Sequence, residues 1–255
     1  MSAALEQQRA AAALVLTVVS GDDFALAGSG AIREHGVIDR PTQDIDLFTN
    51  DTGIDRFAAA VERAISALTD HGYQAVVARS AAQFARLVVT ARDGYQFEID
   101  FGVDWRAHEP VWLEVGPVLA LEDAIANKVG ALYSRGAARD YFDVDAIRRS
   151  GRFSDDVLLQ LVAEHDPGFD PVMFAEQLGR VDTLRPSTLA EYGVSPDQLR
   201  ALQRRLRAWR QEILKRHTNE PTDANVDPSD VNAPGTELRH EPPRHPDRPP
   251  PGFSI

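Results

Sequence analysis

The composition of the chain changes abruptly after Arg216, and this change limits how much of it can form a packed domain. Residues 217–255 hold nine of the sixteen prolines and almost no large apolar side chains. Such a segment cannot bury enough apolar surface to offset its conformational entropy. We therefore expect a disordered, Pro-rich acidic tail over 217–255. The remaining residues are long enough for one large domain or two small ones.

Hydrophobic patterning divides the rest of the chain near Pro117. Before Pro117 the pattern predicts helices over 2–20 and 54–71, a short helix ending at residue 35, and strands over 24–27, 44–48, 74–78, 84–90 and 95–101. After Pro117 it predicts helices over 121–134, 139–150, 154–164, 171–181 and 196–216. We expect an α+β fold, with an α/β core over 1–117 followed by a helical domain over 118–216.

Charge and residue content exclude several kinds of site. The chain contains no cysteine, which excludes disulfides, a thiol nucleophile and any Cys-ligated metal. The net charge of −12 disfavours a protein that coats nucleic acid through bulk charge. The longest apolar run, residues 10–19, is too short to cross a bilayer and has no basic leader. We expect a cytoplasmic protein without a membrane partner.

The first candidate site residues are Gly28-Ser29-Gly30, which lie between a predicted strand and a predicted helix. Glycines at such a turn let the backbone approach an anion, and helix N-terminal amides can hold phosphate oxygens. The Ser29 hydroxyl could add a further donor. A tight strand-to-helix turn capped by serine explains the same three residues.

Acidic residues alternate with apolar ones in two predicted strands. Asp44 and Asp46 are two residues apart, so their carboxylates point to the same side of a strand and could share Mg²⁺. Glu98 and Asp100 have the same spacing in a later strand. If the two strands are neighbours, Asp100 can supply a third carboxylate, with Glu98 as the reserve. A solvated strand face explains each pair taken alone.

A fourth group of charged residues lies in the predicted helices after Pro117. Lys128 and Arg135 are seven residues apart and share a helix face, and Asp140 and Asp143 are three apart and do likewise. Arg139 adds a further cation. Cations facing carboxylates could hold a triphosphate, although surface salt bridges explain the same pattern.

The last predicted helix is unusually basic. From Arg200 to Arg216 it carries seven cations and one acid, and Arg200, Arg204 and Arg207 fall on one face. This stripe could follow an RNA backbone. A solvated helix face, or a dock for the acidic tail, explains it equally well.

In order and separation, these motifs resemble one family. The segments 28–36 and 40–48, followed by 128–135 and 139–143, resemble the AbiEii/AbiGii-type nucleotidyltransferase toxins of abortive-infection and toxin–antitoxin systems, which include the MenT toxins. The resemblance covers roughly residues 24–147. Fourteen residues separate Ser29 from Asp44, a longer gap than in aminoglycoside-type or polymerase-type relatives, and this gap agrees better with the AbiEii group.

The resemblance implies a nucleotidyltransferase-like small mixed β-sheet with flanking helices and a C-terminal helical bundle. It implies a Mg²⁺-dependent toxin of the EC 2.7.7 type that transfers NMP from an NTP to the 3′ end of tRNA, which blocks translation and growth. A cognate antitoxin encoded nearby is the implied protein partner. Two alternatives stay open: a protein AMP-transferase of the same fold, and a non-catalytic module that binds a nucleotide or an antitoxin.

The same resemblance assigns roles to the candidate residues. The implied metal ligands are Asp44, Asp46 and Asp100. The implied catalytic set adds Lys128 and Asp140 to these three acids. The implied nucleotide and phosphate ligands are Gly28, Ser29, Lys128, Arg135 and Arg139.

Overall fold

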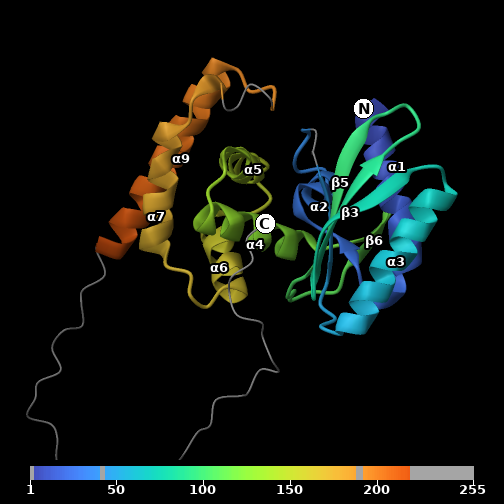
Figure 1. Ribbon diagram of the computed structural model, residues 1–255. Helices are drawn as coiled ribbons and strands as arrows, with labels where there is room; N and C mark the ends of the chain where they lie inside the picture. Colours follow the sequence, from blue (N-terminus) through green and yellow to red (C-terminus); the bar gives the residue numbers. More distant parts are fainter. Residues whose placement is uncertain (1–2, 41–43, 188–191, 219–255) are drawn as a thin grey trace, which may run out of the picture.

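The computed structural model of the protein describes residues 3–40, 44–187 and 192–218. Apart from residues 217 and 218, which continue the last helix, the expected acidic tail lies outside the described residues. Figure 1 shows a sheet-containing half and a helical half side by side.

The first half is built on a mixed sheet that, in the described part of the chain, has seven strands in the order β3-β4-β5-β2-β1-β7-β6. Only the β2–β5 and β1–β7 pairs are parallel. The strands are β1 (Ala25–Leu26), β2 (Asp44–Thr49), β3 (Gln74–Ala81), β4 (Phe84–Thr90), β5 (Gln96–Val103), β6 (Val111–Leu113) and β7 (Gly116–Val118).

Helices α1 (Ala3–Val19) and α3 (Ile54–Asp70) pack against each other and against strands of the sheet. In α3 the buried residues recur at spacings of three and four, from Phe57 to Leu68, which gives this helix one apolar face. A 3₁₀ turn, η1 (Ser20–Asp22), follows α1, and the short α2 (Gly28–Glu34) follows β1.

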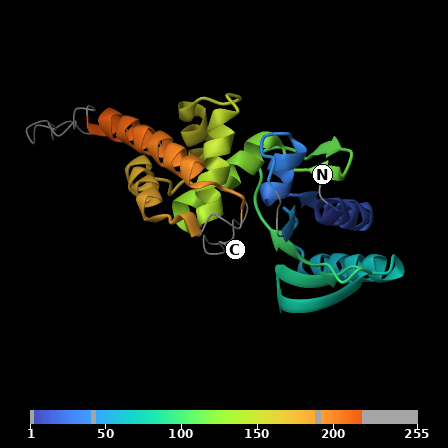
Figure 2. The same ribbon diagram turned by 90° about the horizontal axis from the view of Figure 1, so that it is seen from above.

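The second half contains α4 (Leu121–Ser134), α5 (Ala138–Arg149), α6 (Asp155–His165), α7 (Pro171–Gly179), η2 (Arg180–Thr183) and α9 (Pro196–Thr218). Helix α4 contacts α5, α6 and α7 and also α2, so it joins the two halves, as both views show (Figures 1 and 2). One hydrophobic cluster runs from α1 to α9. No helix in these ranges combines the length and apolar content that a membrane span requires.

The predicted fold class is confirmed, and the predicted helices and strands are present with small shifts at their ends. The sequence pattern missed β6 and β7, which have only three residues each. A strand this short gives too few alternations to be recognised. The expected boundary between residues 117 and 118 falls inside β7, before its last residue, and the division into two domains stays a prediction.

The buried Trp209 of α9 is 1% exposed and packs edge-on against Phe174 of α7, with ring centroids 5.2 Å apart. We expect Trp209→Ala to lower the free energy of unfolding by about 3–5 kcal/mol, because it leaves a large cavity. Trp112→Ala is the control, since Trp112 is 73% exposed, and should change stability by less than about 0.5 kcal/mol. Urea denaturation measures both, and equal effects would contradict this packing.

Candidate active site

The turn from β1 into α2 brings the backbone against β2. The Ala27 amide donates to the Asp46 carbonyl at 2.8 Å. Gly28 has a φ of +56°, and a Cβ at this position would lie 1.8 Å from Oδ2 of Asp46. Only glycine satisfies both the left-handed backbone and the close approach. The start of α2 and the Asp46 carboxylate are therefore in direct contact.

Strand β5 lies beside β2, as the carboxylate hypothesis required. The two strands are parallel, with Asp46 opposite Asp100 and Asp44 opposite Glu98. Since residues two apart in a strand point the same way, all four acidic residues share one face of the sheet.

Asp46 carries the clearest electrostatic signal of the site. The pKa of Asp46 is raised to about 7. The larger cause is the partial burial of its side chain, and the second is the negative charge of Asp44. Asp100 adds to this increase, whereas the cations Lys128 and Arg139 oppose it. Negative charge at this point is therefore only partly compensated by the protein itself.

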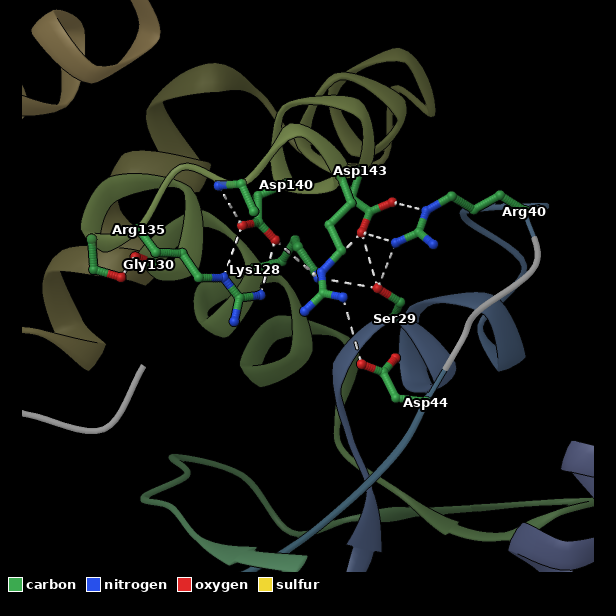
Figure 3. Close-up of polar contacts among 11 residues, drawn as sticks. Ser29, Arg40, Asp44, Lys128, Gly130, Arg135, Asp140 and Asp143 are labelled. Carbon is green, nitrogen blue, oxygen red and sulfur yellow. Dashed lines mark hydrogen bonds and ion pairs between the residues drawn. The ribbon is translucent and has the colours of Figure 1, made fainter. Parts of the chain in front are cut away.

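The other two carboxylates of the predicted metal set have cationic partners. Asp44 lies 3.6 Å from the guanidinium of Arg139 (Figure 3). Both oxygens of the buried Asp100 accept hydrogen bonds from Arg86, at 2.7 and 2.6 Å. Within the described ranges, no three His, Asp or Glu side chains are gathered as a metal site would need.

Lys128, Ser29 and Arg40 converge on the fully buried Asp143 (Figure 3). Lys128 Nζ lies 3.2 Å from Asp143 Oδ2 and 3.1 Å from Ser29 Oγ. The Ser29 hydroxyl donates to Asp143 at 3.0 Å. Burial alone would raise the pKa of Asp143, but the charges of Lys128 and Arg40 outweigh it and hold this pKa below its ordinary value.

Arg135 and Asp140 form a second ion pair beside this network. Arg135 donates to both oxygens of the buried Asp140, at 2.9 and 3.2 Å, and the Ala137 amide donates to Asp140 Oδ2 at 3.1 Å, which caps α5. Lys128 Nζ is 3.6 Å from the other oxygen. Asp140 and Asp143 are thus buried partners of cations rather than members of surface salt bridges.

The sequence analysis missed Arg40 and Arg86. Arg40 is buried, and its guanidinium donates to both oxygens of Asp143 at 2.6 Å and to Ser29 Oγ at 2.9 Å. Arg40 comes from the connection between α2 and β2, where no periodicity shows its direction. Arg86 is a charged residue in a strand of mainly apolar residues. A cation at such a position indicates an acidic partner on the neighbouring strand, and this signal could have identified Arg86.

The basic helix α9 uses several of its arginines within the fold. Arg200 pairs with Asp197, and Arg207 Nε donates to Asp182 at 2.7 Å. The predicted RNA stripe is therefore partly neutralised by these acids, and RNA binding by this helix stays a prediction.

The contact between Gly28 and Asp46 gives a direct test of the turn. We expect Gly28→Ala to lower the free energy of unfolding by more than the roughly 1–3 kcal/mol that a left-handed backbone alone costs. The control is Gly94→Ala, because Gly94 has a φ of +87° but open space around its Cα. Chemical denaturation of both variants separates the clash from the backbone cost, and equal losses would contradict the close approach.

The raised pKa of Asp46 predicts a pH-dependent stability. The folded state keeps this proton to a higher pH than the unfolded chain, so stability falls as pH rises from about 4 through 7. Asp46→Asn removes that loss and should be more stable than wild type above pH 7, by up to a few kcal/mol, since one pKa unit is about 1.4 kcal/mol.

Urea denaturation between pH 4 and 8 in chelator-containing buffer measures this effect. The control is Asp197→Asn, whose side chain is exposed on α9; it gives the effect of removing one surface carboxylate. A difference between Asp46→Asn and wild type that does not change with pH would contradict the raised pKa.

Comparison with known proteins adds to this geometry. Residues 12–238 match the model of the family described as nucleotidyl transferase AbiEii toxin, type IV TA system. Among solved structures, a putative nucleotidyltransferase from H. pylori is similar, with a TM-score of 0.50 and 17% identity over 85% of this chain and 97% of that chain. No curated protein matches the chain.

Two further structures are similar at slightly lower scores. JHP933 from Helicobacter pylori has a TM-score of 0.49 and 16% identity, over 86% of this chain and 97% of that chain. MenT4, a nucleotidyltransferase toxin from Mycobacterium tuberculosis H37Rv, has a TM-score of 0.47 and 16% identity, over 82% and 84%. The family model covers most of the chain and confirms the predicted resemblance. This chain belongs to the AbiEii nucleotidyltransferase toxin family of type IV toxin–antitoxin systems.

Proposed function

We propose that this protein is a Mg²⁺-dependent toxin that transfers an NMP from an NTP to the 3′ end of tRNA and thereby blocks translation and growth. Its membership of a nucleotidyltransferase toxin family supports the general reaction. The observation that carries the proposal is the contact of Gly28 with the Asp46 carboxylate, on the sheet face that also holds Asp44. The tRNA acceptor follows from the resemblance to MenT toxins.

The carboxylates of β2 fit a divalent cation. Asp44 and Asp46 offer hard oxygen ligands at the spacing of one strand face. The pKa of Asp46 is raised by burial and then by the charge of Asp44, and a bound cation would oppose both effects. These two residues would hold Mg²⁺, with Asp100 as the proposed third ligand. The bound cation supplies charge neutralisation on the phosphates and lowers the pKa of the attacking hydroxyl.

The cations of α4 and α5 would bind the triphosphate. Lys128 is held in place by Ser29, Asp140 and Asp143, so its ammonium needs little reorganisation before it meets developing negative charge. Arg139 and Arg135 add further charge on the same side of the site. Lys128 would stabilise the departing pyrophosphate, where charge builds up in the transition state.

The backbone at Gly28 and the hydroxyl of Ser29 would complete the phosphate site. Gly28 leaves the start of α2 uncovered by a side chain beside Asp46. The Ser29 hydroxyl already accepts hydrogen bonds from Lys128 and Arg40, so it helps to hold both cations in place beside the proposed phosphate site. Asp140 would act by orienting Arg135 and Lys128.

The acceptor and the partner follow from the type of system. A toxin of a type IV toxin–antitoxin system implies an antitoxin, which we propose is encoded nearby. We propose that the chain acts in the cytoplasm, where charged and uncharged tRNA is available. The sheet face with Asp44 and Asp46 would receive the 3′-terminal hydroxyl.

A labelling experiment tests this function. The full-length protein is incubated with Mg²⁺, total tRNA and each α-labelled NTP in turn. We expect label in tRNA with wild type and at least about a hundredfold less with Asp46→Asn, since loss of metal binding costs several kcal/mol in the transition state. The control variant is Asp197→Asn, which should label tRNA like wild type.

Two outcomes of this experiment, and one of a growth assay in cells, have distinct meanings. Label on protein rather than RNA would replace the tRNA acceptor by a protein hydroxyl. No label with any NTP, beside an active control enzyme, would contradict transfer to tRNA. Growth inhibition that persists with Asp46→Asn in cells would favour a non-catalytic toxin.

A further inference from the structure

Three charged side chains form a row across neighbouring strands of the sheet. Asp100 of β5 lies opposite Asp46 of β2 on one side and opposite Arg86 of β4 on the other. Residues at one register level share a face, so Asp100 stands between the proposed metal ligand and an arginine. Arg86 takes up both oxygens of Asp100, at 2.7 and 2.6 Å.

Arg86 has a second acidic partner within reach. Its Nη1 lies 3.1 Å from Oε2 of Glu98, two residues before Asp100 on β5. The two acids differ in burial, because the Asp100 side chain is 1% exposed and the Glu98 side chain 43%. The Arg86 side chain is itself 30% exposed, so its head group can change partners at the edge of the site.

We propose that Arg86 is a positioning residue that withholds Asp100 from the divalent cation and releases it by moving its ion pair onto Glu98. The proposal rests on the proposed function, because it concerns the cation of that site. No covalent step is involved. A carboxylate as buried as Asp100 cannot lose one cation without gaining another, since an unpaired buried charge is very costly.

This exchange accounts for the arrangement of the acids. Among the residues that the structure describes, Asp44 and Asp46 have no such bidentate partner, and they would receive the cation first. The charge of the bound cation would then attract the Asp100 carboxylate toward Asp46, while Arg86 pairs with Glu98 near the solvent. Arg86 thus makes the third ligand conditional on cation binding. It also lowers the affinity of the site for the divalent cation.

Direct Mn²⁺ titration of the full-length chain, without nucleotide or RNA, tests the exchange. Isothermal calorimetry should give Arg86→Met roughly tenfold tighter Mn²⁺ binding than wild type, because the competing ion pair is gone. The double variant Arg86→Met with Asp100→Asn should lose this gain. The matched control is Arg79→Met, which removes the cross-strand neighbour of Arg86 on β3 and should bind like wild type.

Two further measurements keep the test decisive. Mg²⁺ should raise the thermal midpoint of Arg86→Met more than that of wild type, because the cation pairs the buried charge that Asp100 keeps after Arg86 is removed. Should Arg86→Met fail to fold, Glu98→Gln replaces it. Without its second partner Arg86 stays on Asp100, so Glu98→Gln should bind Mn²⁺ several-fold more weakly than wild type.

The outcomes separate this inference from the proposed function. Equal Mn²⁺ affinity in wild type, Arg86→Met and Glu98→Gln overturns the exchange, whatever the acceptor. Weaker binding by Arg86→Met also overturns it, because Arg86 would then support the cation site. The expected affinities without tRNA labelling would support the exchange and overturn only the acceptor. Absence of Mn²⁺ binding in all variants overturns the exchange.

Discussion

The buried charge of Asp143 is the interaction on which the rest of the site depends. Its carboxylate is fully buried, and it accepts hydrogen bonds or ion pairs from Ser29, Arg40 and Lys128. These partners come from α2, from the chain before β2 and from α4. The charged and polar partners of this buried carboxylate offset its desolvation cost, and the loss of one partner would leave part of that cost uncompensated. The network therefore fixes the two halves of the molecule in one relative position.

The same network explains how a site can be assembled from distant parts of the sequence. Gly28 and Asp46 meet because β1 and β2 are neighbours. Lys128 reaches them because α4 packs against α2. The site thus combines the strand carboxylates, which attract cations, with helix cations, which attract phosphate. Each set carries charge that the other balances only in part. The proposed metal and nucleotide would neutralise the remaining charge of the carboxylates and of the cations.

Much of this arrangement could be predicted from residue patterns, and the missing parts have clear physical reasons. The two-residue spacing predicted that Asp44 and Asp46 lie on the same side of one strand, and Glu98 and Asp100 on the same side of another. This prediction needs only the local geometry of a strand. In the sequence analysis, that the strands now labelled β2 and β5 are neighbours was only a condition, since strand order and register depend on the whole sheet. The metal set of three carboxylates remains a prediction, because Arg86 occupies Asp100 in the described structure.

Long-range partners were the main gap in the sequence analysis. Arg40 lies in a connection without periodicity, and its contact with Asp143 spans more than a hundred positions. The contact of Gly28 was expected to be with phosphate, and the structure adds its contact with Asp46. In both cases, the local sequence indicated an unusual residue but not the group it faces.

The position of α4 has a consequence for how the molecule can move. This helix packs on α2 with one side and on α5, α6 and α7 with others, so it belongs to both halves. A hinge motion that separated the halves would pull Lys128 away from Ser29 and remove Ser29 and Arg40 from Asp143. Substrate capture by domain closure is therefore disfavoured in this fold, and a nucleotide would bind beside two halves that are already held together.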